Sequence, residues 1–162
     1  MKKNKLSALF LLVASIALTP AFSQESASSS GPKLLDPSVI PKLDRTGKTR
    51  QGLASYYDDR FAGRLMADGT PLDPEAHVAA SRTLPLGTKA RVTNLENGKS
   101  AVVEIRDRGP YVEGRIVDVT PTVAKRLGMI EQGVASVEVT PIEVPQRDGS
   151  IKRARAIRTG NR

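Results

Sequence analysis

Two alternating stretches joined by an Asn-Gly pair constrain the fold of this chain more than any other feature. In residues 88–94 and 100–106, apolar and polar side chains alternate, so each stretch has one apolar face. This period of two is typical of a half-buried β-strand, and Asn97-Gly98 tolerates the positive φ angles of a tight hairpin turn. The sequence therefore predicts a β-hairpin here.

Further short segments of the same kind occur along the chain. Strands are expected at residues 52–57, 115–119 and 137–144. The alternation slips at Thr140-Pro141, which indicates a bulge. A helix is expected between Thr120, followed by a proline, and Gly128, and a shorter helical turn at Asp73. Many short strands with one or two short helices favour a small closed barrel over an open sheet.

The first residues predict export. A basic stretch at residues 1–5 precedes a mainly apolar run at residues 6–18. A membrane-spanning helix needs about 20 apolar residues, so this run indicates a signal peptide at residues 1–23, with an uncleaved anchor as the alternative. A periplasmic or extracellular location is expected. Lipid attachment at the cleavage site would need a cysteine, and the chain has none.

The rest of the chain divides into three segments by composition. Residues 24–50 are rich in Ser and Pro and predict a disordered linker, and residues 51–145 form the expected barrel. Residues 146–162 carry six basic side chains and one acidic one, and predict a disordered basic tail that attracts anionic wall polymers or lipid headgroups. The formal net charge of +8 lies mainly at the two ends, because residues 51–145 hold eleven basic and thirteen acidic side chains.

Composition excludes several kinds of chemistry. Without cysteine there is no disulfide framework and no thiolate zinc site, and a single histidine excludes a histidine-rich metal site. No metal and no cofactor are expected, so chemistry here must depend on carboxylates. Nucleic-acid binding is not expected, because the cations lie in terminal segments without aromatic side chains to stack on bases. A monomer is expected.

Several multi-residue motifs resemble one known family. In chain order they are Gly52-x-Ala54-Ser55-Tyr56-Tyr57, Phe61-x-Gly63-Arg64, Ala67-Asp68-Gly69, Thr83-Leu84-Pro85-Leu86-Gly87-Thr88, Asp107-Arg108-Gly109-Pro110 and Gly114-Arg115-Ile116-Val117-Asp118. Over roughly residues 51–145 the chain resembles the double-psi β-barrel domain of the rare lipoprotein A (RlpA) family. The resemblance implies an all-β fold, a six-stranded double-psi β-barrel. It also implies an endolytic lytic transglycosylase that cleaves peptidoglycan strands lacking stem peptides and leaves 1,6-anhydro ends.

The resemblance also implies three polar site residues, of which one is present. The family's Glu after the Ala-Asp-Gly motif is Thr70 here, and its His before the Thr-Leu-Pro motif is Ser81. The family's Asp is present as Asp107, the first catalytic candidate, with a turn-stabilising carboxylate as the alternative. Thr70 cannot act as a general acid at neutral pH. A non-catalytic glycan-binding barrel is therefore the alternative function.

Other residues are weaker candidates. Asp118 is a carboxylate within an apolar strand, either a satisfied core acid or a cleft residue. Asp68 lies in a loop rich in turn formers, and Glu75 with His77 lies near the two altered positions.

Candidate substrate-binding residues are tyrosines, which stack on sugar rings, and arginines, which bind carboxylates; ordinary packing or ion pairing is the alternative for each. They are Tyr56, Tyr57, Arg64, Arg108 and Tyr111.

Overall fold

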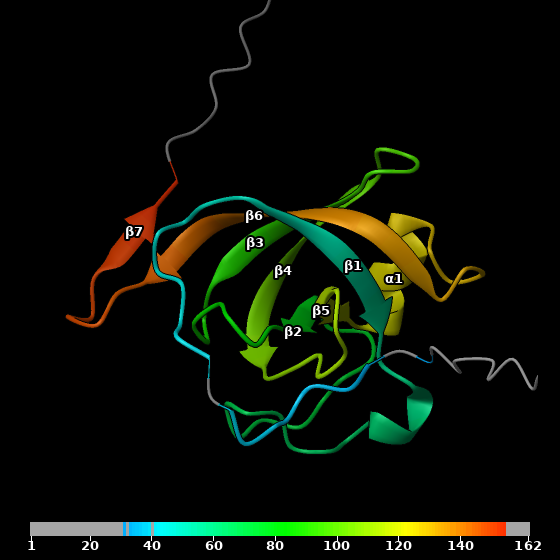
Figure 1. The fold of residues 1–162 in the computed structure, drawn as a ribbon, viewed down its shortest axis with the longest axis horizontal. Helices are drawn as coiled ribbons and strands as arrows, with labels where there is room; N and C mark the ends of the chain where they lie inside the picture. The colour runs from blue at the N-terminus through cyan, green and yellow to red at the C-terminus, as the bar shows by residue number, and fades with distance from the viewer. Residues whose placement is uncertain (1–30, 32, 40, 155–162) are drawn as a thin grey trace, which may run out of the picture. The chain divides into compact units, whose positions relative to one another are not determined.

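The strands expected from the alternating pattern are present and close into a barrel (Figure 1). The structure is a computed structural model that describes residues 31, 33–39 and 41–154. The predicted signal peptide and residues 24–30 lie outside the described residues. No helix in the described part of the chain has the length and apolar character needed to cross a membrane.

Seven strands, one α-helix and one 3-10 helix make up the fold. They are β1 (Arg50–Tyr56), η1 (Asp59–Phe61), β2 (Val78–Ala80), β3 (Lys89–Asn94), β4 (Ser100–Asp107), β5 (Arg115–Val119), α1 (Pro121–Leu127), β6 (Val134–Pro145) and β7 (Ile151–Arg153). Strand order around the sheet is β1-β5-β2-β4-β3-β6, and β6 also pairs with β1, which closes a six-stranded ring. The pairs β1–β5 and β2–β4 are parallel, and the others in the ring are antiparallel. The predicted six-stranded double-psi barrel is confirmed.

The alternating apolar residues fill the barrel as their period predicts. Val92 on β3 and Val103 and Ile105 on β4 are fully buried, and the turn between these strands has Gly98 at φ 73°. Each such side chain contributes about 1.5–3 kcal/mol when it leaves water. The helix adds Leu127 to the same core and ends at Gly128, as expected. The shorter turn expected at Asp73 is present, and the Asp73 side chain accepts a hydrogen bond from the Glu75 amide (2.9 Å).

The segment before β1 contacts the barrel where the sequence suggested a disordered linker. The Leu35 amide donates to the Tyr111 carbonyl (2.8 Å), and the Asp44 amide donates to the Thr83 carbonyl (2.7 Å). The Arg45 guanidinium donates to the Pro145 carbonyl at the end of β6. These hydrogen bonds hold the segment against the barrel. Composition alone did not predict them, because it does not show which backbone groups find partners. The barrel strand itself starts at Arg50, one residue before the predicted boundary.

The chain after β6 also differs from its prediction. The sequence suggested a disordered tail from residue 146, whereas β7 pairs with β6 in an antiparallel hairpin, with Val144 opposite Lys152. The turn uses Asp148, which accepts hydrogen bonds from the amide and hydroxyl of Ser150, and Gly149 at φ 83°. The tail prediction is therefore corrected for residues 146–154; residues 155–162 lie outside the described part.

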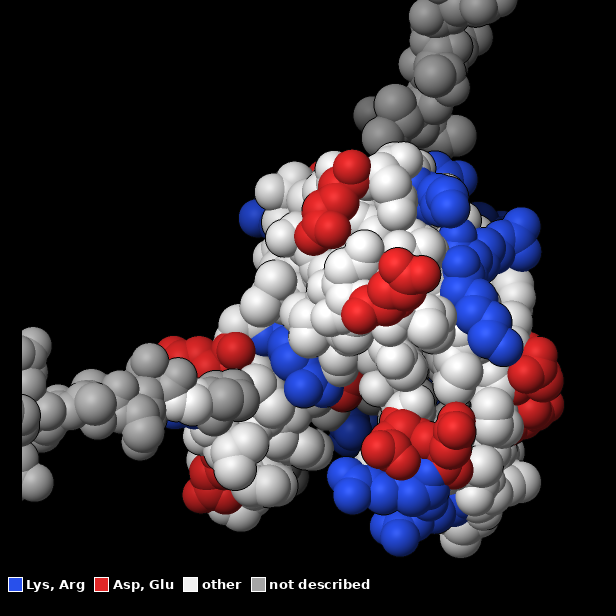
Figure 2. Space-filling model, turned by 90° about the vertical axis from the view of Figure 1, so that its right-hand side faces the viewer, with Lys and Arg blue, Asp and Glu red and all other residues white. Residues whose placement is uncertain are grey.

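The surface carries both signs of charge. Figure 2 shows basic side chains gathered at the upper right of one face and again at its lower edge, with acidic side chains between and beside them. The nearly balanced charge of the barrel is therefore distributed in local patches.

Candidate active site

A row of residues across four strands brings two candidate carboxylates to one end of the barrel. Asp107, the last residue of β4, pairs with Ala80 of β2. Ala80 also pairs with Asp118 of β5, and Asp118 pairs with Ser55 of β1. The barrel topology thus places Ala80 between Asp107 and Asp118, although Ala80 precedes both of them in the chain.

Asp107 is held at both carboxylate oxygens. Its Oδ1 accepts hydrogen bonds from the backbone amides of Ala67 (2.9 Å) and Arg108 (2.8 Å). Its Oδ2 accepts a hydrogen bond from the Tyr57 hydroxyl (3.0 Å). Burial is the main cause that raises the pKa of Tyr57, and the negative charge of Asp107 is the second. The Tyr57 hydroxyl therefore stays protonated and remains a donor. The carboxyl group therefore has a fixed orientation.

Asp107 opens onto a groove of about 250 Å³, which we name the Asp107 groove. Its other lining residues are Tyr57, Phe61, Arg64, Leu65, Met66 and Leu72. The Tyr57 and Phe61 rings meet edge to face with centroids 6.2 Å apart, and the Arg64 guanidinium carbon lies 5.4 Å from the Phe61 centroid. A carboxyl group beside aromatic rings and an exposed guanidinium is an arrangement that suits a sugar chain bearing carboxylates.

A second pocket, of about 290 Å³, contains two other substrate-binding candidates, Arg108 and Tyr111. The segment before β1 lines it as well, through Pro37, Val39, Pro41 and Leu43, together with Arg82. The Arg108 Nη1 donates to the carbonyls of Ser81 (2.9 Å) and Leu84 (2.8 Å), and burial lowers the pKa of Arg108. Arg108 therefore fixes the loop after β2 as well as lining this pocket.

Thr70 occupies the position at which the family resemblance implies Glu. Its amide and hydroxyl both donate to Asp68 Oδ1 (2.9 and 2.6 Å), and Asp68 Oδ2 accepts a hydrogen bond from Arg106 Nε (2.7 Å). The hydrogen bond from the Thr70 hydroxyl is the largest of the effects that lower the pKa of Asp68. Asp68 is therefore held as a carboxylate by Thr70 and Arg106, and it does not line the Asp107 groove.

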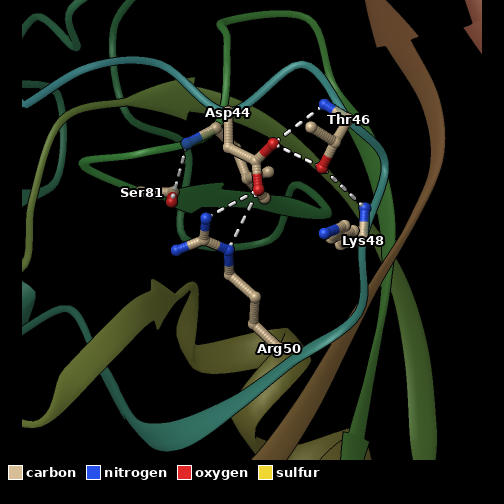
Figure 3. A network of polar contacts seen from close by, with 6 residues as sticks. Asp44, Thr46, Lys48, Arg50 and Ser81 are labelled. Carbon is tan, nitrogen blue, oxygen red and sulfur yellow. Dashed lines mark hydrogen bonds and ion pairs between the residues drawn. The ribbon is translucent and has the colours of Figure 1, made fainter.

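Ser81 occupies the position at which the resemblance implies His. It is only 2% exposed, and its hydroxyl oxygen accepts a hydrogen bond from the Leu84 amide (3.3 Å). Figure 3 shows it beside Asp44, whose carboxylate is bound by Thr46 and Arg50. Ser81 lines a pocket of only about 10 Å³ together with Lys48 and Arg50, so a larger side chain at position 81 would require its neighbours to move.

Asp118 is engaged with two neighbours. The Arg115 Nη2 donates to both of its oxygens (2.7 and 2.8 Å), and the Ser55 hydroxyl donates to Oδ1 (2.5 Å). The Asp118 side chain is 15% exposed. Its contacts are those of a satisfied structural carboxylate, which was one of its two interpretations from sequence.

The remaining candidates lie elsewhere. Exposed Glu75 accepts a hydrogen bond from the Thr122 hydroxyl (2.6 Å) at the start of α1, and it does not line the Asp107 groove. The Tyr56 hydroxyl donates to the Ile130 carbonyl (3.2 Å), and its ring packs against the barrel core. Tyr56 therefore packs against the core and does not line the Asp107 groove.

Sequence reasoning missed the apolar side of the groove. Phe61, Leu65, Met66 and Leu72 line it, and only Phe61 belongs to a motif that the sequence singles out. Within residues 33–39 and 41–154, no three His, Asp or Glu side chains are grouped as metal ligands would be.

Comparisons with known proteins agree on one family. The family model described as "Lytic transglycolase" matches residues 49–139, more than half of the chain. The chain is 53% identical over 91 residues to "Probable endolytic peptidoglycan transglycosylase RlpA" of Nostoc sp., covering 55% of this chain and 24% of that protein. It is 37% identical over 126 residues to "Endolytic peptidoglycan transglycosylase RlpA" of Neisseria meningitidis serogroup B, covering 78% of this chain and 53% of that protein.

Coverage of these relatives is partial. The chain spans between about a quarter and about half of the length of the curated relatives it matches. Among solved structures it is similar to an expansin of Clavibacter michiganensis, with a TM-score of 0.47 and 20% identity over 61% of this chain and 52% of that chain.

Proposed function

Because this chain belongs to the RlpA family of double-psi β-barrel proteins, we propose that it is a lytic transglycosylase that cleaves peptidoglycan glycan strands. The observation that carries the proposal is the Asp107 groove. It places one oriented carboxyl group beside Tyr57, Phe61 and Arg64. The names of the matching family and relatives support the same reaction class.

One carboxyl group is the minimum that this reaction needs. Protonated Asp107 gives its proton to the glycosidic oxygen as the bond from that oxygen to the anomeric carbon breaks, leaving an oxocarbenium-like centre. The resulting carboxylate then takes the proton of the sugar's own 6-hydroxyl as this oxygen bonds to the anomeric carbon. The product carries a 1,6-anhydro ring, no water is consumed, and Asp107 regains its proton. The Tyr57 hydroxyl can donate or accept, so it can follow both states of Asp107.

Arg64 supports a preference for strands without stem peptides. Each stem peptide is joined by an amide bond to the lactyl carboxyl of muramic acid, so this group is a free carboxylate only on naked strands. The exposed Arg64 guanidinium in the Asp107 groove is a suitable bidentate partner for that carboxylate. We therefore propose naked glycan strands as the substrate.

Mass spectrometry of two substrates tests this proposal. The full-length chain is incubated with naked glycan strands and, separately, with strands that retain their stem peptides. We expect anhydro-ended fragments from the naked strands and far fewer from the others. Equal fragmentation of both substrates would contradict the substrate preference, and intact naked strands would contradict the reaction.

A non-catalytic glycan-binding barrel is the second candidate, and Thr70 with Ser81 favours it. Neither side chain can exchange a proton as Glu and His would, and both hydroxyls are engaged in local hydrogen bonds. Co-sedimentation with naked strands separates the two candidates. Binding without any anhydro product would support the binding barrel, whereas anhydro product would support the transglycosylase.

We also propose that the protein acts outside the cytoplasm, in the periplasm or the extracellular medium. The basic stretch at residues 1–5 and the apolar run at residues 6–18 support this location. Intact-mass measurement of the exported protein is expected to give a chain that begins near Gln24. A protein found only in the cytoplasm and still carrying Met1 would contradict it.

A further inference from the structure

A strongly basic pocket lies on a part of the barrel that the proposed reaction does not use. We name it the basic pocket; its volume is about 710 Å³, and five cationic side chains line it. They are Lys42, Arg45, Arg50, Arg147 and Lys152. It shares no lining residue with the Asp107 groove.

The charge of the basic pocket is largely uncompensated. Asp44 is the single carboxylate that lines it, and Asp44 is bound to Arg50 (2.7 Å) and to the Thr46 hydroxyl (2.6 Å). The Thr46 hydroxyl is the largest cause that lowers the pKa of Asp44 to about 2. The other four cations form no ion pair with any residue in the described part of the chain. Four unpaired like charges around one hollow repel one another, and a multiply charged anion would relieve that repulsion.

Hydrogen bonds fix the two walls of the basic pocket. One wall is the segment before β1 and the other is the β6–β7 hairpin, which lie close together in Figure 1. The Arg45 guanidinium donates to the Pro145 carbonyl, and the Gln146 side chain donates to the Arg45 carbonyl (3.3 Å). The walls are thus held before any ligand arrives, which lowers the entropy lost on binding.

We propose that the basic pocket binds a chain of phosphate groups, such as a polyphosphate or a phosphodiester polymer. Guanidinium and ammonium groups together are the usual protein partners of phosphate oxygens. The pocket is concave, so it suits a chain that enters between two walls better than the flat surface of a bilayer.

Titration calorimetry with short-chain inorganic polyphosphate tests this proposal on the full-length protein. The test variant is Arg147→Gln with Lys152→Gln, since both side chains are exposed and line the pocket. The matched control is Lys125→Gln with Arg126→Gln on α1, which removes the same charge from exposed positions outside the pocket. Thermal melting of each variant confirms that it is folded.

We expect the wild type to bind, with affinity that falls as salt rises, and the pocket variant to bind about fivefold to twentyfold more weakly. The control variant should bind within about twofold of the wild type. Equally weakened binding in both variants would show that net charge, and not the basic pocket, determines the affinity, and would overturn the proposal. Absence of wild-type binding, or equally tight binding of polyglutamate, would overturn the phosphate assignment. Binding to phosphatidylglycerol vesicles without binding to polyphosphate would overturn the choice of a chain ligand.

Discussion

Replacing Asp118 by Asn separates its structural interpretation from its catalytic one. The substitution removes the negative charge that faces Arg115 and weakens three hydrogen bonds, of 2.5, 2.7 and 2.8 Å. Hydrogen bonds to charged groups contribute about 1.5–3 kcal/mol, and breaking a fully buried ion pair costs about 3–5 kcal/mol. The two side chains are 15% and 25% exposed. We therefore expect a loss of about 2 kcal/mol in the free energy of unfolding.

Thermal unfolding followed by circular dichroism measures this loss. The described residues, up to 154, lie between the domain sizes for which 1 kcal/mol shifts the melting temperature by about 4–8 °C and by about 2–4 °C. A shift of about 4 °C per kcal/mol therefore applies, and Asp118→Asn should lower the melting temperature by about 8 °C. Glu113→Gln is the control, because it removes an exposed pair with Lys33 (side chains 56% and 76% exposed) and should change stability by less than about 1 kcal/mol. Below its melting temperature, the Asp118→Asn variant should cleave glycan at close to the wild-type rate. An unchanged melting temperature together with lost cleavage would refute the structural interpretation.

Three further substitutions and one truncation have defined outcomes. Thr70→Glu places a carboxyl at the position where the family has Glu and should raise the initial rate of anhydro-end formation by ~10²-fold, whereas Ser81→His should lower the melting temperature because Ser81 is buried; an unchanged rate for Thr70→Glu would contradict the first part. The lowered pKa of Asp44, about 2 against 3.8, stabilises the fold above pH 4, and this contribution is lost as the pH falls to about 2. Asp44→Asn should remove that part of the pH dependence in acid-unfolding curves, and a superimposable curve would contradict it. Truncation after Pro145 should lower the melting temperature by only a few degrees, since all three β7 residues are exposed; a large fall would show that the hairpin supports the core.

The alternating pattern predicted five of the six barrel strands. It did not predict β2, whose three residues are all buried and do not alternate, nor the two segments that flank the barrel. Val92, Val103 and Ile105 are buried where the period of two places them. The β6–β7 hairpin was missed because its strand is short and wholly exposed, so it has no apolar alternation. The Asp148-Gly149 pair was the available turn signal. The contacts of the segment before β1 depend on backbone groups, which composition does not reveal.

The residues of the candidate site were likewise predicted only in part. The family resemblance identified Asp107, and Tyr57 was correctly singled out, but its neighbour Tyr56 was not separable from it by sequence. Tyr56 is the last residue of β1 and its ring packs against the core, whereas Tyr57 follows the strand and lines the groove. The bond from the Ala67 amide to Asp107 joins residues 40 positions apart and depends on how the loop after η1 closes. No local pattern predicts such a contact.

The rate at which Asp107→Asn forms anhydro ends on naked glycan strands tests the central claim most directly. Asn keeps the size of the side chain and one acceptor oxygen for the Ala67 and Arg108 amides, so the fold and strand binding should persist. Because general acid and base catalysis typically contributes ~10²–10⁴-fold, we expect a rate at least ~10²-fold below that of the wild type, with an unchanged melting temperature. A folded Asp107→Asn protein that forms anhydro ends at the wild-type rate would contradict the claim that Asp107 carries the proton.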